Sequence, residues 1–203
     1  MKAAISSTVP DGWMSGRTLV LLALLLGGCG ATTSPVVGGV DYAPQYDFSE
    51  FYAVTDGRTF RVIVAGNPFP QLPQAETQRR LLPVMQANRP RPRLTFTYDQ
   101  PAELPRPDYR LVLVFDSAND LTAARVCAGE VRHKARTPEA SSLFAVFAVY
   151  CRNDQALSQA TAWTPVTGPE DPRVGQLFRQ LFVVLFTDSP MVGRRFPFMM
   201  SRF

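Results

Sequence analysis

The stretch Asp171-Pro172-Arg173-Val174-Gly175-Gln176-Leu177-Phe178-Arg179-Gln180-Leu181-Phe182-Val183-Val184-Leu185 decides the fold of this chain. Its apolar residues recur at the i, i+3, i+4, i+7 spacing that places them on one face of a helix. Asp171 is suited to cap this helix and Pro172 fits its first turn, while Asp188-Ser189-Pro190 ends it. Gly175 either lowers the helix propensity or allows a close approach to a sheet. The pattern predicts an amphipathic helix that packs on a sheet.

Two nearly continuous apolar runs supply the centre of that sheet. Residues 109–115 read Tyr-Arg-Leu-Val-Leu-Val-Phe and residues 143–150 read Leu-Phe-Ala-Val-Phe-Ala-Val-Tyr, as is typical of buried strands. The polar residues 152–155 predict a turn, after which residues 156–163 return as a partner strand. Residues 94–98 alternate apolar residues with Thr and predict a half-exposed strand.

The elements before and between these strands are signalled less directly. Residues 51–55 and 59–64 resemble strands, and Asp56-Gly57 between them predicts a β-hairpin, with a loop before a single strand as the alternative. A helical segment begins near Pro73 and continues to Met85. Pro83 inside this segment predicts a kink or a break.

The polar segment 116–142 is long for a loop, and its residues 121–126 predict a short helix. Together the elements predict an α+β fold, with a mixed, mostly antiparallel sheet and helices packed on one face.

The N-terminal segment has the features of an export signal. Residues 19–26 are all apolar and follow Arg17, and the run is shorter than the roughly 20 residues that a membrane span requires. It ends in Leu26-Gly27-Gly28-Cys29, which resembles the lipobox of bacterial lipoproteins. The resemblance implies acylation of the Cys29 sulfur and cleavage before Cys29. Since Gly30 follows the cysteine, the resemblance also permits export to the outer membrane, with the inner membrane or surface exposure as the alternatives. An ordinary signal anchor with an incidental cysteine is the alternative.

These features divide the chain into four parts. Residues 1–28 are expected to be a lipoprotein signal peptide and residues 29–40 a lipidated tether of small residues. Residues 41–190 are expected to form a single α+β domain, followed by a basic and aromatic C-terminal tail at residues 191–203. The start of translation is open between Met1 and Met14, because Met14 would begin a more compact signal.

Charge and cysteine content limit the function further. The chain has 21 Lys and Arg against 17 Asp and Glu, an excess too small to indicate nucleic-acid binding. With Cys29 assigned to lipid, Cys127 and Cys151 remain as a pair, which in an oxidising periplasm predicts a disulfide. Two buried free thiols are the alternative. Two cysteines and the single His133 do not complete a zinc site, so we expect neither metal nor cofactor.

A second resemblance covers residues 40–190. The segment Val40-Asp41-Tyr42-Ala43-Pro44-Gln45-Tyr46-Asp47-Phe48-Ser49-Glu50-Phe51 resembles the opening of a family of small bacterial envelope lipoproteins of unknown function. The later order is also similar, with a helix, a strand at Pro107-Asp108-Tyr109, a hairpin that ends near Trp163, and a final amphipathic helix. The cysteine pair and the phrase Gly66-Asn67-Pro68-Phe69 depart from the family pattern. The resemblance implies a fold and a location, but no activity.

Several residues are candidates for a site, each with a structural alternative. The loop Gly66, Asn67, Pro68 and Phe69 follows a strand, where ligands often bind in α/β sheets, although these residue types also form turns. His133 with Ser141 or Ser142 would suit a hydrolase, and Asp116 with Asp120 a paired-acid mechanism. Solvated residues and turn formers are the alternatives for these groups.

Two basic segments are candidates for contact with the envelope. The clusters Arg79/Arg80 and Arg89/Arg91/Arg93 could bind lipid phosphate or peptidoglycan, and the alternative is a solvated surface. The tail 191–203 combines cationic and aromatic residues, which suits a membrane interface or a partner groove, or else a disordered end.

The sequence therefore predicts a membrane-anchored lipoprotein that faces the periplasm. Its domain is expected to be a non-enzymatic binding or envelope-assembly module, with an envelope protein or peptidoglycan as partner and no catalytic residues. The alternative is a small-molecule or lipid carrier with a cavity between the sheet and the last helix. A hydrolase ranks below both.

Overall fold

The computed structural model describes residues 34–136 and 143–190. The strands are β1 (Val36–Tyr42), β2 (Thr59–Ala65), β3 (Thr95–Thr97), β4 (Tyr109–Phe115), β5 (Leu143–Arg152) and β6 (Gln155–Pro165). The helices are α2 (Phe48–Thr55), α3 (Gln74–Ala87), α4 (Ala123–Cys127) and α5 (Pro172–Leu185). Residues 1–33, which include the predicted leader and Cys29, lie outside the described residues, as do the segment 137–142 and the predicted tail 191–203.

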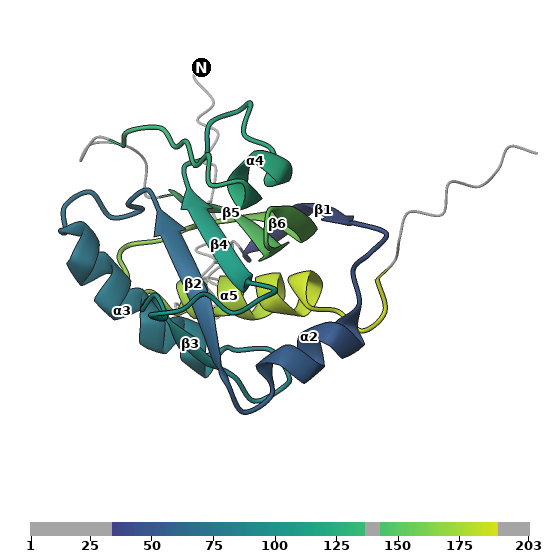
Figure 1. Cartoon of the computed structure of the whole chain (residues 1–203). Coiled ribbons are helices and arrows are strands. Elements are labelled where there is room, and N and C mark those ends of the chain that lie inside the picture. Colours follow the sequence, from purple (N-terminus) through teal and green to yellow (C-terminus); the bar gives the residue numbers. More distant parts are fainter. Residues whose placement is uncertain (1–33, 137–142, 191–203) are drawn as a thin grey trace, which may run out of the picture. The chain divides into compact units, whose positions relative to one another are not determined.

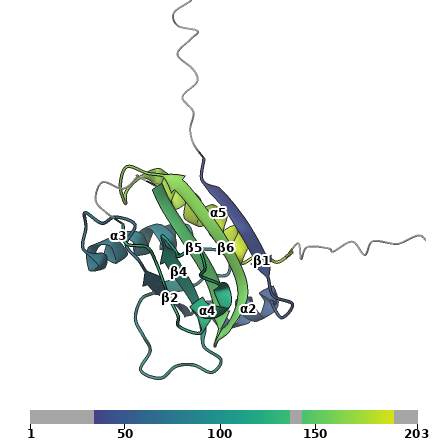
Figure 2. The same ribbon diagram turned by 90° about the horizontal axis from the view of Figure 1, so that it is seen from above.

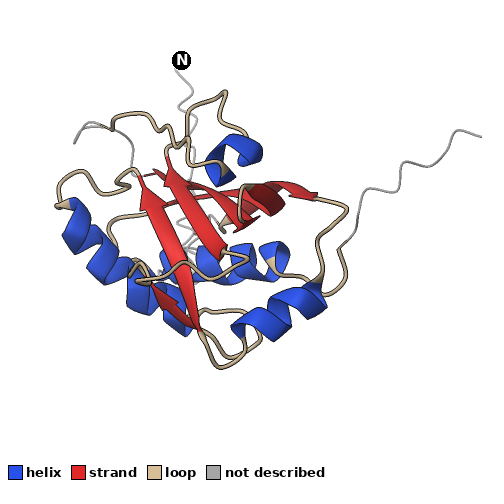
Figure 3. Ribbon diagram, viewed as in Figure 1, coloured by secondary structure: helices blue, strands red, loops and turns tan. Residues whose placement is uncertain are grey.

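The six strands form one mixed sheet in the order β1-β6-β5-β4-β2-β3 (Figures 1 and 3). The pairs β1–β6, β6–β5 and β5–β4 are antiparallel, whereas β2 is parallel to both β4 and β3. This confirms the α+β class and a mixed, mostly antiparallel sheet. The strands expected at residues 94–98, 109–115, 143–150 and 156–163 are all present.

The C-terminal helix has the position that its apolar pattern predicts. Asp171 caps α5 by accepting a hydrogen bond from the Arg173 amide at 3.0 Å. Helix α5 lies against β6 and β1 (Figure 2). Its inward side chains are fully buried: Val174, Leu177, Phe178, Leu181, Phe182 and Leu185. Gly175 faces α3 and not the sheet, since a Cβ there would lie 3.0 Å from the Asn88 amide nitrogen. The glycine therefore allows the two helices to approach each other.

The helices do not all pack on one face of the sheet. The main core joins the sheet to α2, α3 and α5, through residues such as Phe51, Leu81 and Phe178. Helix α4 lies on the opposite face (Figure 1), where a smaller core joins it to the central strands through Val126 and Val149 among others. The short helix expected at residues 121–126 is thus present, but it covers the second face.

The expected tether at residues 29–40 overlaps a strand. The described domain begins at Ser34, and β1 pairs with β6 from Val36 onward. The small residues that resemble a linker form an irregular edge strand, with Gly39 at φ +60° beside a shift of register. Glycine adopts this conformation without steric cost, and such bulges are common at sheet edges. The domain therefore starts earlier than residue 41.

The β-hairpin expected around Asp56-Gly57 is wrong, because residues 48–55 form helix α2. Asp47 caps this helix by accepting a hydrogen bond from the Ser49 amide at 2.7 Å. Phe51 and Thr55 are then four residues apart on the buried side of the helix. The Asp-Gly turn joins α2 to β2 instead.

Helix α3 continues through Pro83 without a break. Pro83 is exposed, so the carbonyl group that loses its helical donor can bind water. Within the described ranges, no helix combines the length and apolar character that a membrane span requires.

Candidate functional site

The loop after β2 uses its polar side chain to hold a turn. The Asn67 amide nitrogen donates to the Leu72 carbonyl at 2.7 Å. Its Oδ1 accepts from the Phe69 amide and from the Thr77 hydroxyl, both at 3.0 Å. Phe69 is buried against Phe144. These contacts account for Asn67 as a turn former between β2 and α3, and a ligand role for residues 66–69 stays a prediction.

His133 lies beside this loop, at the ends of β2 and β4. A Cβ on Gly66 would be 3.3 Å from the His133 ring, and His133 pairs with Ser117 in an isolated β-bridge. The His133 side chain is exposed. Ser141 and Ser142, which the hydrolase hypothesis requires, lie outside the described residues.

The two aspartates considered as paired acids bind different arginines. Asp116 is half-buried and forms an ion pair with Arg136, which also donates to the Pro68 carbonyl at 3.2 Å. Asp120 is exposed and pairs with Arg132 at 2.6 Å, and this hydrogen bond lowers the pKa of Asp120. Each carboxylate is thus held by its own guanidinium. The described residues contain no group of His, Cys, Asp and Glu that would hold a metal.

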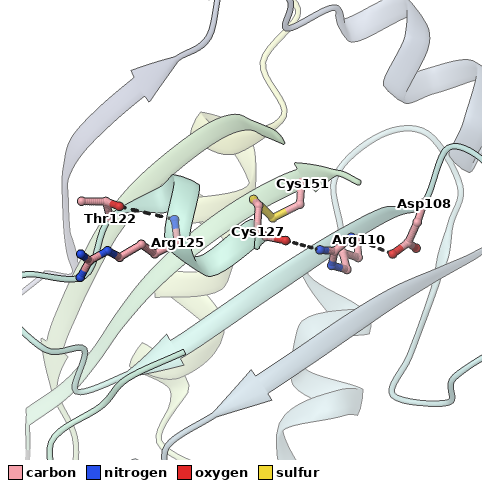
Figure 4. The surroundings of a disulfide bond; sticks show 6 residues. All are labelled: Asp108, Arg110, Thr122, Arg125, Cys127 and Cys151. Carbon is pink, nitrogen blue, oxygen red and sulfur yellow. Dashed lines mark hydrogen bonds and ion pairs between the residues drawn. A yellow bond between two sulfur atoms is a disulfide. The ribbon is translucent and has the colours of Figure 1, made fainter. Parts of the chain in front are cut away.

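The expected disulfide joins Cys127 at the end of α4 to Cys151 in β5, with 5.6 Å between the Cα atoms. Both residues are buried. Arg110 ties this region to the end of the β3–β4 loop (Figure 4), because its guanidinium bonds the Cys127 carbonyl at 2.6 Å and the Asp108 carboxylate at 2.7 Å. The bond and the arginine together fix α4 on the second face of the sheet.

Beneath the loop from β3 to β4, the described residues form a cavity of about 390 Å³. Its floor is formed by the first residues of β2 and β4, and its wall by the loop. Charged and amide side chains gather in it: Arg61, Asp99, Gln100, Glu103 and Asp108. Pro101, Pro105 and Tyr109 supply apolar surface. The volume and the mixed lining are those of small-ligand sites, which usually span about 300–1,000 Å³.

Arg61 is the arginine that lines this cavity. Its Nη2 donates to the Gln100 side-chain oxygen at 3.3 Å. Its Nε is buried and has no hydrogen-bond partner among the described residues. Asp99 is held at the rim by the Thr97 hydroxyl, which donates to its carboxylate at 3.1 Å.

Tyr109 forms a rigid wall of the same cavity. Its hydroxyl donates to Glu50 of α2, and Arg152 donates to both oxygens of that carboxylate at 3.0 Å. Its ring stacks on Tyr150, with 6.2 Å between the centroids. Burial first, and then the bond to Glu50, raise the pKa of Tyr109. The hydroxyl therefore stays protonated and acts as a donor at neutral pH.

Sequence reasoning did not identify this cavity. Two signals were present: an arginine within the mostly apolar strand at residues 59–65, and the long proline-containing segment 99–108. A buried-strand arginine needs a partner, and a long loop is often functional. The β3–β4 loop lies over β2 because β2 pairs in parallel with both β3 and β4. No local sequence pattern encodes this pairing.

The arginine clusters have different environments. Arg79 and Arg80 both pair with Glu76 on the surface of α3. Residues 89, 91 and 93 are exposed arginines around a shallow hollow of about 270 Å³, and they form no ion pair within the described part of the chain. Contact of this second cluster with phosphate or peptidoglycan stays a prediction.

The chain matches no protein-family model and no curated protein sequence. Among solved structures it is similar to a point variant of PelC from Paraburkholderia phytofirmans, which was solved as a dodecamer. That likeness has a TM-score of 0.40 and 10% identity, and it covers 76% of this chain and 99% of the PelC chain. So remote a likeness identifies neither a family nor a function.

Proposed function

We propose that this chain is a bacterial envelope lipoprotein, anchored by acylated Cys29 to the outer membrane, whose domain is a non-enzymatic binding module in the periplasm. The lipobox Leu26-Gly27-Gly28-Cys29 supports the anchor. The disulfide between Cys127 and Cys151 supports an oxidising compartment, since such bonds are rare in the cytosol.

The cavity lined by Arg61 carries the binding role, and it lies at the end of the sheet opposite to the end where β1 begins. Four residues lie between Cys29 and Ser34, where the described domain begins, so the two can be at most about 18 Å apart. Val36 pairs with Trp163 at one end of β6, whereas the cavity is near the other end of β5, beside Arg152. A ten-residue strand such as β5 is about 30 Å long. A linker of this length would limit the distance between the anchor and the end of the sheet where β1 begins.

Metabolic labelling with palmitate tests the anchor. The full chain should incorporate label and fractionate with the outer membrane, and the Cys29→Ser variant should do neither. Label retained by Cys29→Ser, or a chain recovered in the soluble fraction of wild-type cells, would reject the anchored form.

Crosslinking in intact cells tests the binding role. A photo-reactive residue at position 103, on the exposed rim of the cavity, should capture an envelope partner, and the same residue at the exposed position 183 on α5 serves as the control. Equal capture at both positions, or none at position 103, would count against binding at the cavity.

A small-molecule carrier remains the second candidate, but at a different place from the one first expected. The space between the sheet and α5 is filled by buried aromatic rings, as in the contact of Phe182 with Phe96 at 5.2 Å. The cavity under the β3–β4 loop would hold such a ligand instead. Native mass spectrometry of the purified chain would show a bound small molecule in that case.

A further inference from the structure

One edge of the Arg61 guanidinium group has a hydrogen-bond donor without an acceptor among the described residues. The Nε and Nη2 donors of an arginine point in the same direction, and a carboxylate accepts from both at once. In Arg61 the Nη2 donor has only the 3.3 Å bond to Gln100, and the buried Nε donor has no partner among residues 34–136 and 143–190. A buried donor without a partner is costly and rare. The single amide oxygen of Gln100 thus occupies an edge that suits two carboxylate oxygens.

Two carboxylates in the same cavity have no cationic partner. Asp99 and Glu103 line the cavity, are exposed, and form no ion pair within the described ranges. Asp108 differs, because its carboxylate already pairs with Arg110 at 2.7 Å. The cavity therefore offers one guanidinium edge and two available acids.

This combination discriminates between classes of ligand. A simple anion would be attracted by Arg61 but repelled by Asp99 and Glu103. A simple cation would be attracted by the two acids but repelled by Arg61. A molecule with both charges gains from all three groups. The apolar surface of Pro101, Pro105 and Tyr109 suits a small uncharged side chain.

We infer that the cavity binds a zwitterionic amino acid or short peptide. Its carboxylate takes the Nε–Nη2 edge of Arg61 and replaces the Gln100 amide, while its ammonium group lies between Asp99 and Glu103. The β3–β4 loop must shift slightly for this exchange, because Gln100 belongs to it. The inference rests on the proposed role of the domain as a binding module, and it names the class of ligand.

Calorimetric titration of the full-length chain in detergent tests the charge requirement. The probe is alanyl-alanine, with N-acetyl-alanyl-alanine and alanyl-alanine amide as controls that each lack one charge. We expect a Kd of about 1 mM or tighter for the dipeptide, within the reach of so small a ligand, and at least tenfold weaker binding of both controls. No heat at ~10 mM dipeptide, or equal binding of all three compounds, would overturn the inference.

Variants then assign the contacts. Arg61→Met should reduce the affinity at least tenfold, and Arg58→Met, at an exposed arginine just before β2, should leave it unchanged. Glu103→Gln should weaken binding severalfold, and its exposed position removes the concern that the protein fails to fold. Gln100→Ala should bind at least as tightly as the wild type, because it removes the competing amide. Weaker dipeptide binding by Gln100→Ala would contradict the inference that the ligand carboxylate replaces the Gln100 amide on Arg61.

The outcome separates this inference from the proposed function. Palmitate labelling of Cys29 and crosslinking at the cavity do not depend on zwitterions. If both succeed while the dipeptide fails to bind, the ligand class is wrong and the anchored binding module stands.

Discussion

Phe51 and Phe186 stack face to face, with 4.3 Å between their ring centroids and 12° between their planes. Phe51 comes from α2 and Phe186 is the residue that ends α5, so the pair joins an early helix to the last helix on the same face of the sheet. Tyr150 of β5 packs edge-on against both rings. This contact closes the main core at the end nearest the cavity wall formed by Tyr109.

Replacing Phe51 by Ala should therefore lower the free energy of unfolding by about 3–5 kcal/mol, since a fully buried ring is lost and leaves a cavity. Urea denaturation followed by circular dichroism measures the change. Tyr52→Ala, at the neighbouring exposed side chain, should cost less than about 1 kcal/mol. Equal losses in the two variants would contradict the assigned orientation of α2.

Loss of the disulfide should destabilise the domain through the unfolded state. A bond between residues 24 apart should contribute roughly 3 kcal/mol in the chain-entropy description. The double variant Cys127→Ala/Cys151→Ala should unfold at correspondingly lower urea. A reductant should lower the stability of the wild type and leave the double variant unchanged, and an identical response of both proteins would exclude the bond.

Gly66 should not tolerate a side chain. Its φ is +77°, and a Cβ would approach the Phe115 carbonyl oxygen to 2.5 Å. We expect Gly66→Ala to cost at least about 1–3 kcal/mol, from backbone strain and the steric clash. Gly168→Ala is the matched control, because nothing lies within 4 Å of its Cβ position, and it should be nearly neutral. A neutral Gly66→Ala would show that the loop adopts another conformation.

Asp171 should give the domain a stability that depends on pH. Hydrogen bonds from the Arg173 guanidinium, followed by backbone amides, hold the pKa of Asp171 well below its usual 3.8. Its folded-state pKa is depressed, so its contribution is complete above pH 3.8 and is lost as the pH falls toward the folded value. Asp171→Ala should cost about 1 kcal/mol at pH 7, as for other helix caps.

Urea titrations at neutral and acidic pH would check this. The difference between wild type and Asp171→Ala should shrink below pH 3.8. Glu170→Gln, at the adjacent exposed acid, should show little difference at either pH. A difference between wild type and Asp171→Ala that grows on acidification would refute the assigned cap.

Much of the fold was predictable where a local pattern and the tertiary environment agree. Apolar residues must be buried whatever the order of the strands. This applies to the apolar face of residues 174–185 and to the two buried strands at 109–115 and 143–150. The predictions failed where the same residues suit two local structures. Residues 51–55 have strand-like composition, yet the cap at Asp47 and the burial of Phe51 favour a helix.

The candidate site was predictable only in part. The pairing of Cys127 with Cys151 followed from counting cysteines. The cavity did not, because it requires Arg61 from one strand and Gln100 from a loop that lies 39 residues further along the chain.

The sequence by itself predicted an export signal with its Cys29, and it determined the disulfide partners and the amphipathic helix that covers the sheet. Each depends on residue types at short or countable spacings. Only the tertiary structure decided that β2 pairs in parallel with β3 and β4, and that the intervening loop places Asp99 and Glu103 with Arg61. The physical reason is that strand pairing is set by the burial of whole faces of the sheet, which depends on all the strands together and not on any one segment.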